Sequence, residues 1–110
     1  MTTTSTTEAL VVLVTVPDGA TADKLAEALV GERLAACVNV LGGVRSVYRW
    51  KGAVERAEEL LCVCKTTRAA FPRLHARVVE LHPYELPEVI ALPVEAGHAP
   101  YLEWITASVG

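Results

Sequence analysis

Cysteine and histidine, the residue types that most often bind transition metals, occur here in two spaced pairs. Cys62 and Cys64 are two residues apart in an apolar run, so both thiols of a strand point to one side. Such a pair can ligate a soft ion such as Cu(I), but free cysteine is among the most buried residue types, and Leu60 beside it favours the core. His75 and His82 share a helix face but lie about 10 Å apart along the axis, too far for one ion.

Two charged residues interrupt an otherwise apolar strand face. Glu59, Leu61, Val63 and Lys65 alternate along one side of a predicted strand. An unpaired charge on a buried face costs several kcal/mol, so Glu59 and Lys65 need partners. Two interpretations stay open, which are ion pairs across a subunit interface and a ligand pocket in a cleft between subunits.

Several amphipathic aromatic residues stand near the expected ends of strands and helices, namely Tyr48, Trp50, Tyr84 and Trp104. They suit either anchoring at an interface, which we favour, or the walls of a ligand cleft. Glu85 and Glu88 flank Pro87, which keeps that segment extended, so their carboxylates can line the same cleft.

Sequence signatures of catalysis are missing. No nucleophile carries an adjacent base, no glycine-rich loop suits a phosphate, and no HExxH motif or paired-acid pattern is present. We therefore predict a binding protein and not an enzyme.

The elements that must position these residues follow from periodicity. Strands are predicted at 9–16, 35–50, 53–66 and 89–94. Helices are predicted from a cap at Thr21 to about Gly31, at 68–82 and at 99–109. Two βαβ units joined by a hairpin, with right-handed crossovers, predict an α+β fold. It is a ferredoxin-like βαββαβ sandwich with both helices on one sheet face and a C-terminal helix. The bare sheet face then needs a neighbouring subunit.

Glycine and proline mark the bends and ends of these elements. Gly42-Gly43 is interpreted as a bend within one long strand, with a hairpin turn as the alternative, and Lys51-Gly52 is the preferred turn. Pro72 allows the second helix to begin a residue or two after Arg68, and Pro83 ends it. Pro93 indicates an edge strand, which the aromatic side chains of the last helix are expected to cover.

Length and composition bound the class of protein. The 110 residues divide into a disordered tail at 1–7, nearly all Thr and Ser after Met1, and one domain at 8–110. An apolar fraction of 52% is high for this size and favours a subunit interface, while a net charge of -3 gives no footprint for nucleic acid.

Targeting and redox signals are equally sparse. No apolar run approaches the roughly 18 to 20 residues that span a bilayer, and no basic segment precedes the first strand. Three cysteines, an odd number without paired CxxC units, argue against disulfides or a structural zinc site. The sequence thus predicts a soluble cytoplasmic protein with reduced thiols and no membrane partner.

Four stretches resemble the CutA divalent-cation-tolerance family in order and spacing. They are LAACVN at 34–39, SVYRWKG at 46–52, residues 59–66, and HPYELPE at 82–88. The resemblance implies a ferredoxin-like homotrimer whose long hairpins pack around a three-fold axis, similar in architecture to the PII signalling proteins. Family members are associated with divalent-metal tolerance and copper binding, and animal relatives with anchoring of acetylcholinesterase. One departure is Gly42-Gly43, where the family often carries a proline.

The resemblance also singles out metal-ligand candidates. Cys37 lies in the first matched stretch, where it can join a site at a subunit boundary, although its apolar neighbours favour packing. His82 begins the last stretch near Glu85, and its alternative is a helix-terminal histidine near the last carbonyls. We therefore predict Cys37, His82 and Glu85 as ligands for copper or another divalent ion, which folding does not require. The predicted ligand or interface cleft comprises Tyr48, Trp50, Glu59, Lys65, Tyr84, Glu88 and Trp104.

Together these observations predict a homotrimer that binds a metal ion, such as copper, or a small ligand in metal homeostasis or signalling. The alternative is a structural or adaptor trimer that anchors a protein partner without binding a ligand.

Overall fold

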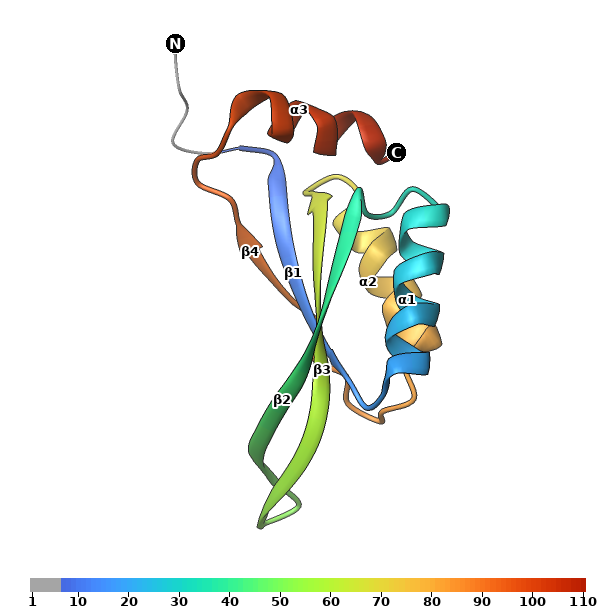
Figure 1. Cartoon of the computed structure of the whole chain (residues 1–110), viewed down its shortest axis with the longest axis vertical. Helices are drawn as coiled ribbons and strands as arrows, with labels where there is room; N and C mark the ends of the chain where they lie inside the picture. The colour runs from blue at the N-terminus through green and yellow to red at the C-terminus, as the bar shows by residue number, and fades with distance from the viewer. Residues whose placement is uncertain (1–6) are drawn as a thin grey trace.

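The computed structural model describes residues 7–110 and contains four strands and three helices (Figure 1). They are β1 (Ala9–Val16), α1 (Gly19–Gly31), β2 (Cys37–Trp50), β3 (Ala53–Thr67), α2 (Phe71–Leu81), β4 (Ile90–Pro93) and α3 (Ala99–Ser108). The expected disordered tail at 1–7 lies outside the described residues except for Thr7. The Thr7 hydroxyl donates a hydrogen bond to the carbonyl of Val94 at 2.8 Å, so this residue is tied to the end of β4.

The four strands form one antiparallel sheet in the order β2-β3-β1-β4, which confirms the α+β class. β3 lies between β2 and β1, in keeping with its two mostly apolar faces, and β4 is an edge strand, as Pro93 predicted. α1 and α2 lie on one side of the sheet, while α3 crosses its end (Figure 1).

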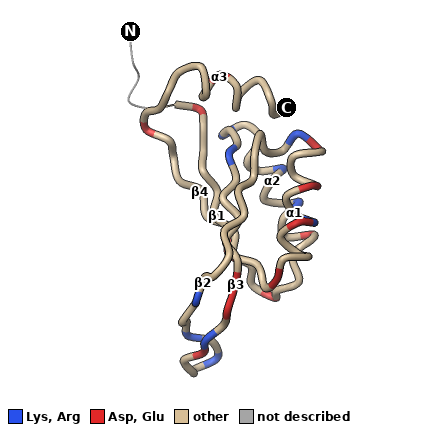
Figure 2. The backbone as a smooth tube through the Cα atoms, viewed as in Figure 1, with Lys and Arg blue, Asp and Glu red and all other residues tan. Residues whose placement is uncertain are grey.

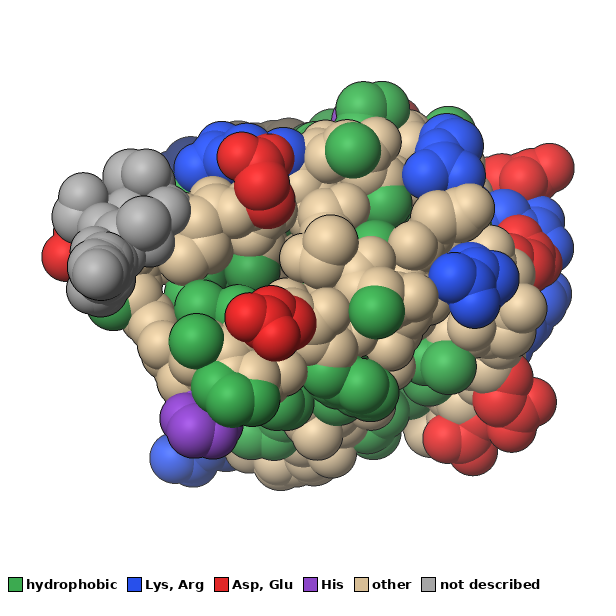
Figure 3. Space-filling view, turned by 90° about the horizontal axis from the view of Figure 1, so that it is seen from above, with side chains coloured by type: hydrophobic (Ala, Val, Ile, Leu, Met, Phe, Trp, Pro, Cys, Tyr) green, Lys and Arg blue, Asp and Glu red, His purple; other side chains and the backbone are tan. Residues whose placement is uncertain are grey.

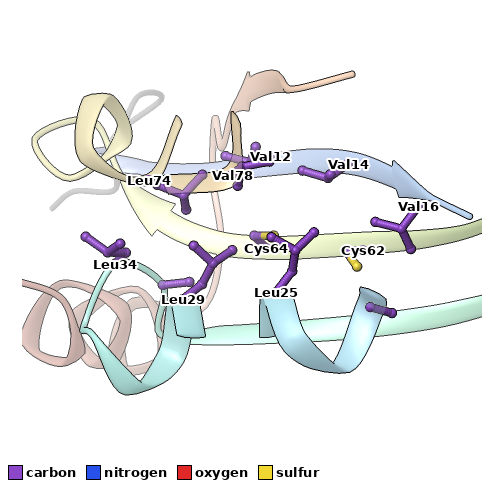
Figure 4. Packing of buried hydrophobic residues seen from close by; sticks show 12 residues of the cluster. Val12, Val14, Val16, Leu25, Leu29, Leu34, Cys62, Cys64, Leu74 and Val78 are labelled. Atoms are coloured by element: carbon purple, nitrogen blue, oxygen red, sulfur yellow. The ribbon is translucent and has the colours of Figure 1, made fainter. Parts of the chain in front are cut away.

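The core lies between the sheet and these two helices. Alternate residues of β1 and β3 face α1 and α2, and Figure 4 shows Val12, Val14, Val16, Cys62 and Cys64 packed against Leu25, Leu29, Leu74 and Val78. Burial raises the pKa of the Cys64 thiol to about 12, so it stays protonated at neutral pH. The two cysteines thus fill the core, which was the favoured interpretation.

α1 begins earlier than predicted. It starts at Gly19, and the side chain of Asp18 accepts a hydrogen bond from the backbone N–H of Thr21 at 2.8 Å. Asp18 is therefore the N-cap, and the prediction that Thr21 caps the helix was wrong. The same hydrogen bond lowers the pKa of Asp18 because it stabilises the carboxylate.

β2 and β3 form one long hairpin, as predicted. The pairing shifts between Leu41 and Val44, where Gly43 has a φ of 74°, so Gly42-Gly43 is a bulge and not a turn. The turn is at Lys51 and Gly52, whose positive φ values of 50° and 83° suit a two-residue hairpin loop. Residues 44–59, here called the hairpin arm, extend beyond β1 and pair only with each other (Figure 1).

α2 is shorter than 68–82. It begins at Phe71 with Pro72 in its first turn, as that proline allowed, and ends at Leu81. His82 has an extended backbone with ψ of 136°, because the proline that follows disfavours the helical conformation. Leu74 and Val78 are buried as expected, whereas His75, assigned to the same stripe, is exposed and stacks on Phe71.

α3 does not cover the edge of β4. It packs on β1 and β3 at the end of the sheet through the buried Ile105, and Tyr101 and Trp104 remain largely exposed. The prediction that these aromatic side chains cover the edge is therefore wrong for a single chain. Figure 3 looks down on this end and shows hydrophobic side chains gathered there among polar ones. None of the described helices is long and apolar enough to cross a membrane.

The sheet face opposite α1 and α2, here called the open face, is uncovered in one chain. Its side chains are mostly apolar, namely Val11, Leu13, Leu41, Leu61, Val63, Ile90 and Leu92. Leu41, Ile90 and Leu92 are close to half exposed. Contiguous exposed apolar surface is typical of protein–protein interfaces and of ligand-binding grooves.

Candidate ligand groove

A groove lies where the hairpin arm meets the segment that follows α2. It has a volume of about 770 Å³. Its lining comes from the end of β1 (Thr15), the hairpin arm (Ser46, Val47, Tyr48, Arg49, Trp50, Glu55 and Glu59) and residues 83–88 (Pro83, Tyr84, Glu85, Leu86 and Glu88). The fold thus brings together three segments that are far apart in the sequence.

A hydrogen bond between Tyr84 and Glu59 joins the two sides of the groove. The Tyr84 hydroxyl donates to Glu59 Oε2 at 2.7 Å, and Glu59 is only 8% exposed. Burial, assisted by this hydrogen bond and the charge of Glu59, raises the pKa of Tyr84 to about 12. The phenol therefore remains a donor at neutral pH, and it gives Glu59 one hydrogen-bond partner but no opposite charge.

His82 holds the segment after α2 against β1. Its Nδ1 accepts a hydrogen bond from the backbone N–H of Tyr84 at 3.1 Å, so the proton of the neutral ring is on Nε2. Nε2 then donates to the carbonyl oxygen of Thr15 at 2.7 Å. Both ring nitrogens are occupied within the chain, and neither faces a free ligand position.

Lys65 finds its partners at the other end of the sheet. Its Nζ lies 3.8 Å from Cys37 Sγ and donates to Asn39 Oδ1. Lys65 is opposite Val11 on β1, whereas Thr15, which lines the groove, is four residues further along that strand, about 13 Å away. Lys65 and Cys37 are therefore not part of the groove.

The structure gathers most of the predicted cleft residues but not all of them. The groove contains Tyr48, Trp50, Glu59, Tyr84 and Glu88, and also Glu85, which was predicted as a metal ligand. Trp104 lies on α3, outside the groove. Within residues 7–110, no three His, Cys, Asp or Glu side chains are placed to hold one metal ion. A site that combines Cys37, His82 and Glu85 would need more than one chain, and it stays a prediction.

Two charged residues of the groove were missed by the sequence analysis. Glu55 is directly opposite Tyr48 in the hairpin, a pairing that follows from the turn at Lys51-Gly52 and was therefore available as a signal. Arg49 alternates with Tyr48 and Trp50, so regular strand geometry places its side chain on the other face of β2. Two-stranded ribbons twist strongly, and such a twist can turn both faces of the arm toward one groove.

Replacing Tyr84 with Phe tests the Tyr84–Glu59 contact. The folded pKa of about 12 lies above the ordinary value of 10.0, so this interaction stabilises fully below pH 10 and is lost as the pH rises through 12. We expect Tyr84→Phe to abolish the highest-pH step in an ultraviolet tyrosine titration. We also expect it to lower the free energy of unfolding at neutral pH by about 1–3 kcal/mol, since Glu59 loses its donor.

Tyr101→Phe is the matched control, because Tyr101 is exposed on α3. It should leave both the step near pH 12 and the neutral-pH stability unchanged. If the titration step near pH 12 is still present in Tyr84→Phe, that step does not belong to Tyr84.

The comparisons with known proteins agree on one family. The family model described as "CutA1 divalent ion tolerance protein" matches residues 10–108. The "Divalent-cation tolerance protein CutA" of Thermus thermophilus is 52% identical over 100 residues, which cover 91% of this chain and 97% of that protein. "Protein CutA" of Mus musculus is 48% identical over 92 residues, 84% of this chain and 52% of that protein, so the chain spans about half of this relative.

A solved structure supports the same assignment. The structure of the "Divalent cation tolerance protein (Cut A1)" from Thermus thermophilus has a TM-score of 0.91 and 51% sequence identity to this chain. The match covers 93% of this chain and 99% of that one. The resemblance found in the sequence is thereby confirmed, and the chain belongs to the CutA1 divalent ion tolerance family.

Proposed function

We propose that this chain is the subunit of a homotrimeric, non-catalytic binding protein that acts in divalent-cation tolerance through metal homeostasis or signalling. The observation that carries the proposal is the groove of about 770 Å³, which combines aromatic and acidic side chains from the hairpin arm and from residues 83–88. This volume falls within the range of about 300–1,000 Å³ that small-molecule sites occupy.

The trimer is supported by the open face. The strand order β2-β3-β1-β4 with two helices on one side fits a ferredoxin-like sandwich, which covers only one face of its sheet. The other face is apolar, and a second and third copy of the chain are the proposed cover. In such an assembly the hairpin arms extend past the sheet and can reach neighbouring subunits.

The hydrogen bonds of the groove support binding in preference to catalysis. The Tyr84 hydroxyl donates to Glu59, and both ring nitrogens of His82 bond to the backbone, so these groups hold the groove in shape.

We place this role in the cytoplasm. The three free cysteines suit a reducing compartment. Relatives include "Protein CutA, chloroplastic" of Arabidopsis thaliana and the "Periplasmic divalent cation tolerance protein CutA" of Archaeoglobus fulgidus, so the family is not confined to one compartment.

Native mass spectrometry of the purified protein at submicromolar concentration tests the proposal. We expect a mass of three chains that retains a small molecule, and we expect Trp50→Ala to lose that molecule because the indole lines the groove. Trp104→Ala is the matched control, since Trp104 is exposed outside the groove. A trimer that never carries a ligand would favour the adaptor alternative, and single chains would reject the proposal.

The same measurement with Cu(I) added under anaerobic conditions tests the metal site. Of the three candidate ligands, Cys37 supplies the sulfur that Cu(I) prefers, and it is a free, partly exposed cysteine, so Cys37→Ser is expected to abolish copper retention. Cys62→Ser is unsuitable as a control because that thiol is in the core. Copper retention that survives both Cys37→Ser and His82→Gln would reject the predicted ligands.

A further inference from the structure

We infer that the groove selects a small organic cation, a primary ammonium group carried on a short apolar or aromatic body. The inference rests on the proposed function and names the ligand class of the same groove.

The lining of the groove carries a net negative charge. Glu55, Glu59, Glu85 and Glu88 line the groove, and Arg49 is the basic side chain among its lining residues. Four carboxylates against one guanidinium leave three net negative charges around one cavity. A concave site lined by one sign of charge concentrates ligands of the opposite sign. Figure 2 shows that charges of both signs lie on the hairpin arm. Most of the acidic excess in the groove therefore comes from Glu85 and Glu88, which residues 83–88 add to the lining.

One carboxylate oxygen of Glu59 accepts no hydrogen bond from the described residues. This carboxylate is more than nine-tenths buried, and Tyr84 donates only to Oε2. No donor from the described residues contacts Oε1, although a carboxylate can accept several hydrogen bonds. A neutral phenol also leaves the negative charge of Glu59 uncompensated. An N–H of an ammonium group supplies both the missing hydrogen bond and the opposite charge.

The spacing of the acidic side chains favours an organic cation over a metal ion. Within residues 7–110, the acidic side chains are too dispersed to place three of them around one ion. A hard cation such as Mg²⁺ needs converging oxygens at about 2.1 Å. An organic ammonium group can bind among carboxylates that are spread apart. It needs one N–H···O contact and the negative potential of the other carboxylates.

Aromatic side chains form part of the groove wall. Tyr48, Trp50 and Tyr84 line the groove, and aromatic faces attract cations. The ammonium of Lys51 lies 5.6 Å from the centroid of the Trp50 ring, so a ligand cation at this ring face would displace the exposed Lys51 side chain. The aromatic rings also account for the apolar body of the proposed ligand, which a bare ion lacks.

Three probes with a similar body and different charge test the inference by isothermal titration calorimetry on the full-length assembled protein. They are phenethylamine, which is a cation, phenethyl alcohol, which is neutral, and phenylacetate, which is an anion. We expect the amine to bind at least about tenfold more tightly than the alcohol, because it gains one charge-assisted hydrogen bond. Phenylacetate is expected to bind most weakly. Amine affinity should also fall as salt is added.

Two variants and one control assign the effect to the groove. Glu59→Gln is expected to weaken the amine about tenfold and to leave the alcohol unchanged. Glu88→Gln keeps the Tyr84–Glu59 hydrogen bond and should give a smaller loss. Glu27→Gln, at an exposed position on α1, should change nothing. Circular dichroism and the native mass of each variant establish that it is folded and assembled.

Each outcome decides between the proposals. If the alcohol or phenylacetate binds as tightly as the amine, the cation inference is wrong and the groove remains a ligand site. If amine binding is unchanged in folded Glu59→Gln, the inference is wrong as well. If none of the three probes binds, the groove itself is rejected as a small-molecule site together with the inference.

Discussion

Ile90→Lys is expected to convert the protein from an assembly of three chains into single chains. Ile90 is 49% exposed in one chain and lies opposite Leu13 on the open face. In the proposed trimer this face is buried, and an unpaired lysine there costs several kcal/mol per subunit. Light scattering after gel filtration gives the mass directly, and circular dichroism establishes that the separated chains keep their secondary structure.

Val79→Lys is the matched control for this experiment. Val79 is also 49% exposed, but it lies on α2, which covers the opposite face of the sheet. Val79→Lys also replaces an apolar side chain with lysine at equal exposure, and we expect this variant to keep the mass of three chains. If Ile90→Lys remains trimeric, or if the unmodified protein is a folded single chain in dilute solution, the open face is not the interface.

Leu74→Ala is expected to lower the free energy of unfolding by about 2–5 kcal/mol. Leu74 is fully buried in α2 and packs in the cluster between the helices and the sheet (Figure 4). Its truncation removes apolar contact and leaves a cavity that the close-packed neighbours fill only in part. Denaturant unfolding at one fixed protein concentration measures the change, because the stability of an oligomer depends on concentration.

Adjacent valines on α2 supply the control. Val78 is fully buried and Val79 is about half exposed, so Val78→Ala and Val79→Ala make the same chemical change on the same helix. We expect Val78→Ala to cost about 2 kcal/mol, and Val79→Ala to stay within about 0.5 kcal/mol of the unmodified protein. Equal losses at the two positions would contradict the described orientation of α2.

The sequence predicted the elements whose signals are local. The unbroken β-branched run from Ala9 to Val16 and the Lys51-Gly52 turn are each recognisable within a few residues, and both are where they were expected. The α1 cap was wrong for a local reason: Asp18 lies in the turn sequence Pro17-Asp18-Gly19 directly after β1, and an aspartate there can both end a strand and cap the next helix.

The parts that failed depend on contacts between distant segments. Glu59 and Tyr84 belong to elements separated by all of α2, so their hydrogen bond follows from where that helix returns the chain. The position of α3 is likewise set by the burial of Ile105 on the sheet, which helical periodicity alone does not show. Residue type was a better guide than geometry, since most predicted cleft residues do line the groove.

The bulge in β2 has a consequence for how this chain tolerates changes in length. From Leu41 to Val44, β2 advances three residues while its partner β3 advances two. As a result, the residues of β2 on the open face have odd numbers before the bulge and even numbers after it. The bulge absorbs that single extra residue, so Val44 is again directly opposite Glu59, and Tyr48 and Trp50 lie on the same side as Glu59. Deleting one of the two glycines would restore simple alternation with the same pairing beyond it, so both rings would keep their side of the arm and only the local bend would be lost.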